Sequence, residues 1–301
     1  MPSPSSLHGV RVWLSGSVPP SDTMNEAERK AIEGFVGSFA AEIFRLGGHI
    51  IHGSHPTFTP ILLDKAIEHQ KSGGKRDCLT LAVSRHWSKD TNKVPINEWR
   101  KTCATYETPE ATGSNARDDS LKVLRQWMAG RCDAFVAVGG LWWQQVTGRA
   151  GVPIEAALAL DRGLPCFLLG GLGGAAGTYV REHPELMRML KNGLDEQSNA
   201  AIATREDVGS LSAVVCEQLA RLPVVKGRTA DGPSFRILAL DGGPPRARCY
   251  HRRCRRCFRF DCCCESLCAP WVVLPAAWTP SVSAPDDSGV ECRPRSEPAK
   301  R

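Results

Sequence analysis

A glycine pair followed by an acidic residue in the next helix is the feature of this chain that most directly suggests chemistry. Gly139 and Gly140 end the apolar run AFVAVGG, Gly151 follows after a loop, and Glu155 comes one turn into the next helical pattern. Glycine lets backbone N–H groups approach a phosphate. A carboxylate above such a turn suits ribose hydroxyls, or acid–base work at an anomeric carbon. The pattern predicts a nucleotide pocket, with Glu155 as the catalytic residue if the protein is a hydrolase.

Small or charged residues also follow the earlier apolar runs of the chain. Five of them are further candidates for ligand binding: Gly16, Ser17, Gly53, Ser54 and Arg85. The carboxyl ends of parallel strands share one edge of a sheet, and ligands bind there. Tight turning alone would also place glycine at these positions. No turn has the spacing GxGxxG or GxxxxGK[ST], which argues against an ordinary dinucleotide dehydrogenase and a P-loop NTPase.

Aromatic, basic and imidazole side chains near these turns leave alternatives open. Trp142 and Trp143 suit stacking on a base or capping the pocket, and equally suit plain packing. Arg85 and Arg149 suit either phosphate contact or a solvated surface. The three histidines between His49 and His55 are spaced by three, so they cannot share one face of a strand. We therefore expect no metal site from these histidines, and no cofactor.

Apolar runs that alternate with helical patterns indicate the fold class. The runs expected to be buried strands are Val10–Leu14, His49–His55, Cys78–Val83, Ala134–Gly140 and Cys166–Gly171. The main helical patterns are residues 31–46, Pro60–Gln70, Ser120–Ala129, Pro153–Asp161 and Val208–Leu222. The polar stretch from Ser88 to Asn115 lacks periodicity and is expected to be an excursion or flexible loop. The alternation predicts an α/β domain over residues 8–223, with a doubly wound, mostly parallel sheet covered on both faces.

Charge and cysteine are concentrated at the end of the chain. The segment from Pro244 onward holds 11 of the 38 Lys and Arg residues but 6 of the 32 Asp and Glu residues, so it carries most of the net charge of +6. The nearly neutral body argues against nucleic-acid binding. Five of the 13 cysteines lie singly in apolar segments of the body, as expected for reduced thiols in the cytoplasm. No signal or membrane-spanning segment is evident, so we expect a cytoplasmic protein without a membrane anchor.

Several of these motifs together resemble the SLOG superfamily. They are the serine–glycine turn after the first strand, GGHIIHGSH, the glycine pair, PIEAALA and GLGGAAG, which span most of residues 10–222. This Rossmann-like group includes the Lonely Guy phosphoribohydrolases, the DNA-processing protein A family and nucleotide sensors. The resemblance implies a Rossmann-like sheet and a nucleotide-derived ligand, such as a cyclic nucleotide or an ADP-ribose relative. Lonely Guy enzymes carry PGGxGTxxE, whereas an insertion here separates GG from GVPIE, which favours the sensor branch over the hydrolase.

A second resemblance begins after a stretch of linker-like composition, residues 224–234. The segment FRILALDGG, residues 235–243, is similar to the first strand of patatin-like phospholipases, which commonly continue as DGGGxRG. Gly242 and Gly243 would then be what is left of an oxyanion hole. No GxSxG follows, so we expect no lipase activity from this chain. The resemblance implies a homo-oligomeric sensor that regulates a lipase effector, truncated here, in bacterial antiviral defence.

The Cys-, Arg- and Pro-rich tail, residues 244–301, allows three interpretations. Its abrupt change of composition is typical of out-of-frame translation of a GC-rich gene. Cys254 and Cys257 form C-x2-C with more cysteines nearby, as in a zinc module. The third interpretation is a disordered basic tail.

Overall fold

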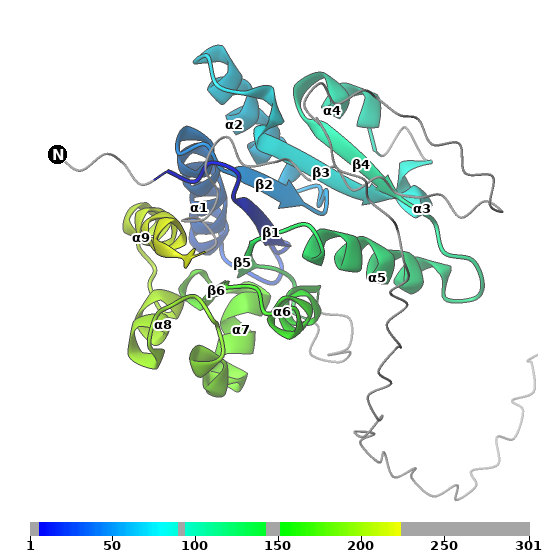
Figure 1. Cartoon of the computed structure of the whole chain (residues 1–301). Coiled ribbons are helices and arrows are strands. Elements are labelled where there is room, and N and C mark those ends of the chain that lie inside the picture. Colours follow the sequence, from blue (N-terminus) through cyan, green and yellow to red (C-terminus); the bar gives the residue numbers. More distant parts are fainter. Residues whose placement is uncertain (1–5, 90–93, 143–150, 224–301) are drawn as a thin grey trace, which may run out of the picture. The chain divides into compact units, whose positions relative to one another are not determined.

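The computed structural model describes residues 6–89, 94–142 and 151–223 (Figure 1). The chain divides into two units, Met1–Arg236 and Ile237–Arg301. The second unit lies entirely outside the described residues. The same holds for the expected linker, the patatin-like segment with Gly242 and Gly243, and the tail at 244–301.

A parallel sheet of six strands forms the centre of the described residues, in the order β4-β3-β2-β1-β5-β6. The strands are β1 (Arg11–Ser17), β2 (His49–His52), β3 (Leu79–Ser84), β4 (Ala104–Thr108), β5 (Ala134–Gly139) and β6 (Cys166–Leu169). Every neighbouring pair is parallel. The chain builds outward from β1 to β4 and then returns to place β5 on the other side of β1. This order confirms the doubly wound α/β prediction.

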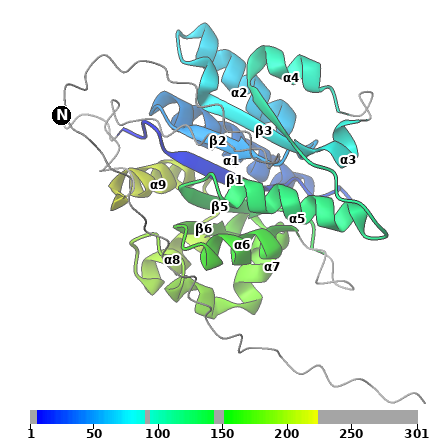
Figure 2. The same cartoon turned by 45° about the vertical axis from the view of Figure 1, so that its right-hand side comes forward.

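Helices cover both faces of the sheet (Figures 1 and 2). One face carries α1 (Glu26–Arg45), α2 (Thr59–Lys71), α4 (Ile96–Thr102) and α9 (Val208–Arg221). The other carries α5 (Ala116–Ala129), α6 (Gly151–Asp161) and α7 (Gly174–Glu182). The short α3 (Arg85–Ser88) follows β3, and α8 (Glu196–Ala203) packs beside β6. Single turns of 3-10 helix are η1 (Arg76–Cys78), η3 (Gly170–Leu172) and η4 (Pro184–Arg188).

Burial on both faces explains the apolar character of the central strands. Val12 and Leu14 of β1 face the core under α1, whereas Trp13 between them faces the opposite core. There its ring meets Phe135 of β5 edge to face, with centroids 5.0 Å apart. Side chains alternate along a strand, so a strand with helices on both sides needs apolar residues at successive positions.

Thiols and membrane-spanning potential bear on the class of protein. The five cysteines of the described residues are all buried and unpaired: Cys78, Cys103, Cys132, Cys166 and Cys216. Burial raises the pKa of each thiol, for Cys166 to about 12, which makes them poor nucleophiles. In the part of the chain that the structure describes, no helix has both the length and the apolar character to cross a bilayer.

The prediction for Ser88–Asn115 is wrong, because this segment contains α4 and β4. β4 is one of the two edge strands, and its sequence ATYET is exposed or half-buried at every position but the last. A strand whose side chains are exposed to solvent does not need the continuous apolar run by which a buried strand is recognised in a sequence. The fold therefore has one more strand than the sequence pattern indicates.

His52, at the end of β2, is a neutral imidazole locked between backbone groups. Its Nδ1 lies 2.9 Å from the Leu14 carbonyl, which can only accept, and its Nε2 accepts from the His55 N–H at 3.1 Å. The proton is therefore on Nδ1. Burial lowers the pKa of His52 from 6.5 to about 4, because the interior disfavours the imidazolium.

We expect the free energy of unfolding to fall as the pH drops from about 6.5 towards 4, because the unfolded chain then binds a proton that folded His52 does not. The loss assigned to this group is on the order of 3 kcal/mol. Urea denaturation between pH 7 and pH 4.5 measures it. His52→Asn should reduce the slope, and a part should remain because burial also lowers the pKa of His49 and His55; substitution of exposed His8 by Asn should leave the slope unchanged. Equal slopes for the wild type and His52→Asn would contradict the assignment.

Gly16 gives the second stability prediction. Its φ is +136°, and a Cβ on it would lie 1.9 Å from the Val138 carbonyl oxygen of β5. Gly16→Ala should therefore cost more than about 4 kcal/mol, or prevent folding. Gly113 has φ +104° but no atom within 4 Å of such a Cβ, so Gly113→Ala should cost only about 1 kcal/mol. Chemical denaturation of both variants measures the two losses of unfolding free energy. Gly16→Ala introduces a clash and backbone strain, whereas Gly113→Ala introduces backbone strain alone. Similar losses would show that the structure adjusts to relieve the clash.

Candidate functional site

The carboxyl ends of β1 and β5 meet where the strand order reverses. Ser17 pairs with Gly139 in the register of the two strands, and the Gly140 N–H donates to the Ser17 carbonyl at 2.7 Å. Connections leave this point in opposite directions, and the resulting crevice is where open parallel sheets bind ligands. The structure thus brings together four of the residues predicted from sequence: Gly16, Ser17, Gly139 and Gly140.

Glycine is required at both positions after β5. Gly139 and Gly140 have φ of +61° and +87°. A Cβ on Gly139 would lie 2.6 Å from the Ser17 carbonyl oxygen, and one on Gly140 would lie 2.7 Å from the Val152 side chain of α6. Close approach of β1 and α6 therefore excludes a side chain from either position. At these two positions of the switch point, the backbone therefore carries no side chain.

A second glycine pair, Gly173 and Gly174, brings the start of α7 to the same place. A Cβ on Gly174 would lie 2.7 Å from the carbonyl carbon of Gly139, and the Ala175 N–H donates to the Gly140 carbonyl at 2.8 Å. No side chain caps the first turn of α7. Uncapped N–H groups at a helix start favour anionic groups. α7 is not among the helices expected from the sequence pattern, although GLGGAAG contains its first residues.

Glu155 is held by donors from two other elements. Ser15 Oγ of β1 donates to Glu155 Oε2 at 2.6 Å, and Arg125 Nε of α5 donates to Oε1 at 3.0 Å. Ser15 is buried, and the Arg125 and Glu155 side chains are only 14% and 16% exposed. Ser15 faces α5 and α6 because it lies two residues after Trp13 on β1 and therefore shares its face of the sheet. Charge-assisted bonds to both oxygens fix the position of the carboxylate.

We call Ser15, Arg125 and Glu155 the Glu155 network, and Gly151 lies beside its ion pair. A Cβ on Gly151 would lie 3.4 Å from Arg125 Nη2 and 3.9 Å from Glu155 Oε1. Gly151 therefore keeps the first turn of α6 open to the ion pair. A fixed carboxylate with spare lone pairs can accept a ribose hydroxyl or take a proton from water.

Gly53, Ser54 and Arg85 lie along the same edge but away from the switch point. Gly53 and Ser54 follow β2, where Ser54 has φ +58° and its Oγ donates to the Ala82 carbonyl of β3 at 2.7 Å. Arg85 is exposed at the start of α3, after β3, two strands from β1. Trp142 is half-buried and packs against the core beneath α5, α6 and α7, which fits its packing role.

Trp143 and Arg149 lie outside the described residues. Within the described ranges, no three His, Cys, Asp or Glu side chains are grouped so that they could hold a metal ion.

Sequence reasoning missed Ser15, Arg125, Gly173 and Gly174. Ser15 directly precedes the Gly16–Ser17 turn, so alternation along β1 could have indicated it. Arg125 gives no local signal, because it lies 30 residues before its partner, within an ordinary amphipathic helix. Only the packing of α5 beside α6 brings them together.

Comparison with known proteins places these features in context. A family model described as SLOG cluster2 matches residues 44–185. The X-ray structure of TM1055, a structural genomics target, aligns with 57% of this chain and 81% of that chain, at 16% identity and a TM-score of 0.36. No curated protein matches the chain. The matched segment includes Arg125, both glycine pairs and Glu155. Over residues 44–185 the chain is therefore similar to the SLOG cluster2 family.

Proposed function

We propose that this domain is a sensor that binds a nucleotide-derived signal, a cyclic nucleotide or an ADP-ribose relative, at the carboxyl ends of β1 and β5. The observation that carries the proposal is the switch point. There the glycines of two strand ends meet, and the Glu155 network holds a carboxylate on a neighbouring helix. The similarity of residues 44–185 to SLOG cluster2 supports a small-molecule ligand.

The chemistry of the site suits the two polar parts of a nucleotide. The start of α7, which no side chain caps and where Gly174 is only half-buried, suits a phosphate. The Glu155 carboxylate offers acceptors to ribose hydroxyls. Arg125 and Ser15 already use one acceptor position on each carboxylate oxygen. Such prior fixation favours binding, because little side-chain entropy is lost when the ligand arrives.

We further propose that ligand binding changes the homo-oligomeric state of the protein and thereby regulates a patatin-like segment beginning at residues 235–243. The support is the sequence resemblance, since this segment lies outside the described residues. Light scattering of the full chain with and without ligand tests the coupling. An unchanged particle mass at saturation would contradict it.

Calorimetric titration of the full chain with AMP, ADP-ribose, 3′,5′-cyclic AMP and cyclic ADP-ribose should detect binding of at least one of them. Glu155→Gln should weaken that binding about tenfold or more, because one charged acceptor is lost. Glu196→Gln is the matched control, since Glu196 pairs with Arg188 at 2.7 Å on the exposed surface. Failure of every compound to bind the folded protein would argue decisively against the sensor.

A phosphoribohydrolase of the Lonely Guy type is the second candidate, and the fixed Glu155 carboxylate favours it. In such a reaction a water oxygen bonds to C1′ of the ribose while the bond from C1′ to the base nitrogen breaks. Glu155 would take the proton from the water, and the departing base would gain a proton. Ser15 and Arg125 would hold the carboxylate in place for this transfer.

Release of free adenine from AMP, followed by chromatography, distinguishes the two candidates. If the protein is a hydrolase, Glu155→Ala should lower the rate by at least about a hundredfold, while Glu196→Ala leaves it unchanged. If the wild type binds AMP and releases no adenine, the hydrolase is excluded and the sensor remains.

A further inference from the structure

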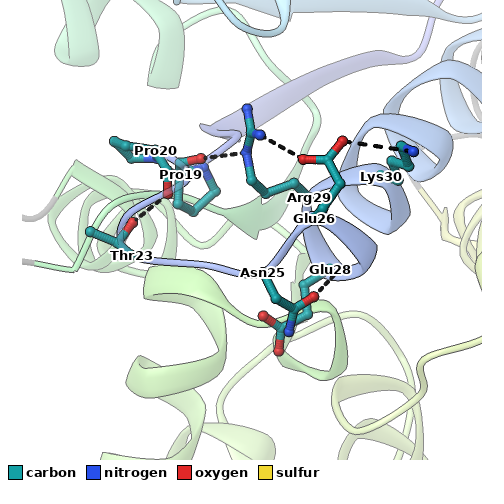
Figure 3. Close-up of polar contacts among 8 residues, drawn as sticks. All are labelled: Pro19, Pro20, Thr23, Asn25, Glu26, Glu28, Arg29 and Lys30. Carbon is teal, nitrogen blue, oxygen red and sulfur yellow. Dashed lines mark hydrogen bonds and ion pairs between the residues drawn. The ribbon is translucent and has the colours of Figure 1, made fainter.

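The loop between β1 and α1 is fixed by its own hydrogen bonds beside the switch point (Figure 3). Three of these bonds join side chains to the backbone of the loop and of the first turn of α1: Arg29 Nε to the Pro19 carbonyl at 3.1 Å, Thr23 Oγ1 to the Pro20 carbonyl at 2.9 Å, and the Glu28 N–H to Asn25 Oδ1 at 2.9 Å. The last bond caps α1. The first turn of this helix therefore has a set position relative to the end of β1.

Glu28 lies on the face of α1 that is directed toward the switch point. Ile32 comes four residues later, one turn further along the same face. Ile32 is fully buried, and its Cδ1 lies 2.9 Å from the place of a Cβ on Gly139. Glu28, one turn nearer the solvent, has its Oε1 3.9 Å from the place of a Cβ on Gly173. Its carboxylate thus stands beside the Gly173–Gly174 turn that packs on Gly139.

The acidic neighbour of Glu28 on the same helical turn is engaged, whereas Glu28 is not. Glu26 pairs with Arg29 at 2.8 Å and with Lys30 at 3.8 Å, as Figure 3 shows. Among the described residues, no side chain forms an ion pair or hydrogen bond with the Glu28 carboxylate. The backbone of Glu28 is fixed by Asn25, and its exposed carboxylate lies beside the Gly173–Gly174 turn.

We propose that Glu28 selects the ribose of the ligand by accepting hydrogen bonds from the vicinal 2′- and 3′-hydroxyls. The inference rests on the nucleotide-binding function proposed above. A carboxylate is acceptor-only and presents two oxygens, which matches two adjacent hydroxyl donors. The ligand class therefore narrows to nucleotides with a free 2′,3′-diol, such as AMP or ADP-ribose, and excludes 3′,5′-cyclic nucleotides, whose 3′-oxygen is esterified.

Titration of the full chain with AMP, 2′-deoxy-AMP, 3′-deoxy-AMP and 3′,5′-cyclic AMP tests the assignment. The wild type should bind AMP about 10- to 100-fold more tightly than either deoxy compound, the range expected for hydrogen bonds to a charged group. Glu28→Ala should reduce this preference to less than about threefold while binding the deoxy compounds as the wild type does. Glu26→Ala is the matched control, because it removes an equally exposed carboxylate from the same turn of α1 and should preserve the preference.

The outcomes separate this inference from the function on which it rests. If AMP binds but the preference for the diol is absent, or persists in Glu28→Ala, the role of Glu28 is overturned and nucleotide binding stands. Binding of 3′,5′-cyclic AMP in preference to AMP would have the same meaning. If no nucleotide binds to the folded wild type, both proposals are lost.

Discussion

The contact between the backbones of β1 and β5 at the switch point is the constraint on which the rest of the site depends. Gly16 lies so close to the Val138 carbonyl that no side chain fits, and Gly139 is equally close to the Ser17 carbonyl. The strands can pair to their last residues only because these positions lack a Cβ. That pairing carries the strand ends, the start of α7 and the first turns of α1 to one place.

The two carboxylates near this contact, Glu155 and Glu28, differ in burial and in charged partners. Glu155 is largely buried and neutralised by Arg125, so it is held in place and contributes to the cohesion of β1, α5 and α6. Glu28 is exposed and without a charged partner among the described residues, so its charge is not neutralised by a neighbouring side chain. A site with one fixed and one free acceptor fits a ligand that carries several hydroxyls.

The central fold could be predicted from sequence because strands buried on both faces consist of apolar residues, which stand out in the sequence. β1, β5 and β6 lie between two layers of helices; β5 and β6 appear in the sequence as unbroken apolar runs, and β1 contains the apolar run VWL. The sequences of β4 and α7 contain no such apolar run. β4 is an exposed edge strand, and α7 begins with small residues, GAAG, whose glycines resemble a turn. The site was predicted in outline for a similar reason, since glycine at strand ends is visible in sequence, whereas Arg125 in the middle of a helix is not.

The sequence by itself determined the alternation of strands and helices, the glycine turns and the place of Glu155 in the chain, because these follow from local periodicity and backbone freedom. Only the tertiary structure decided which turns meet. Strand order is a matter of long-range pairing, so it alone put Gly16 beside Val138 and left Gly53 and Arg85 further along the edge. Likewise, the partners of Glu155 and the direction of the Glu28 side chain depend on helix packing, which residues far apart in the chain determine jointly.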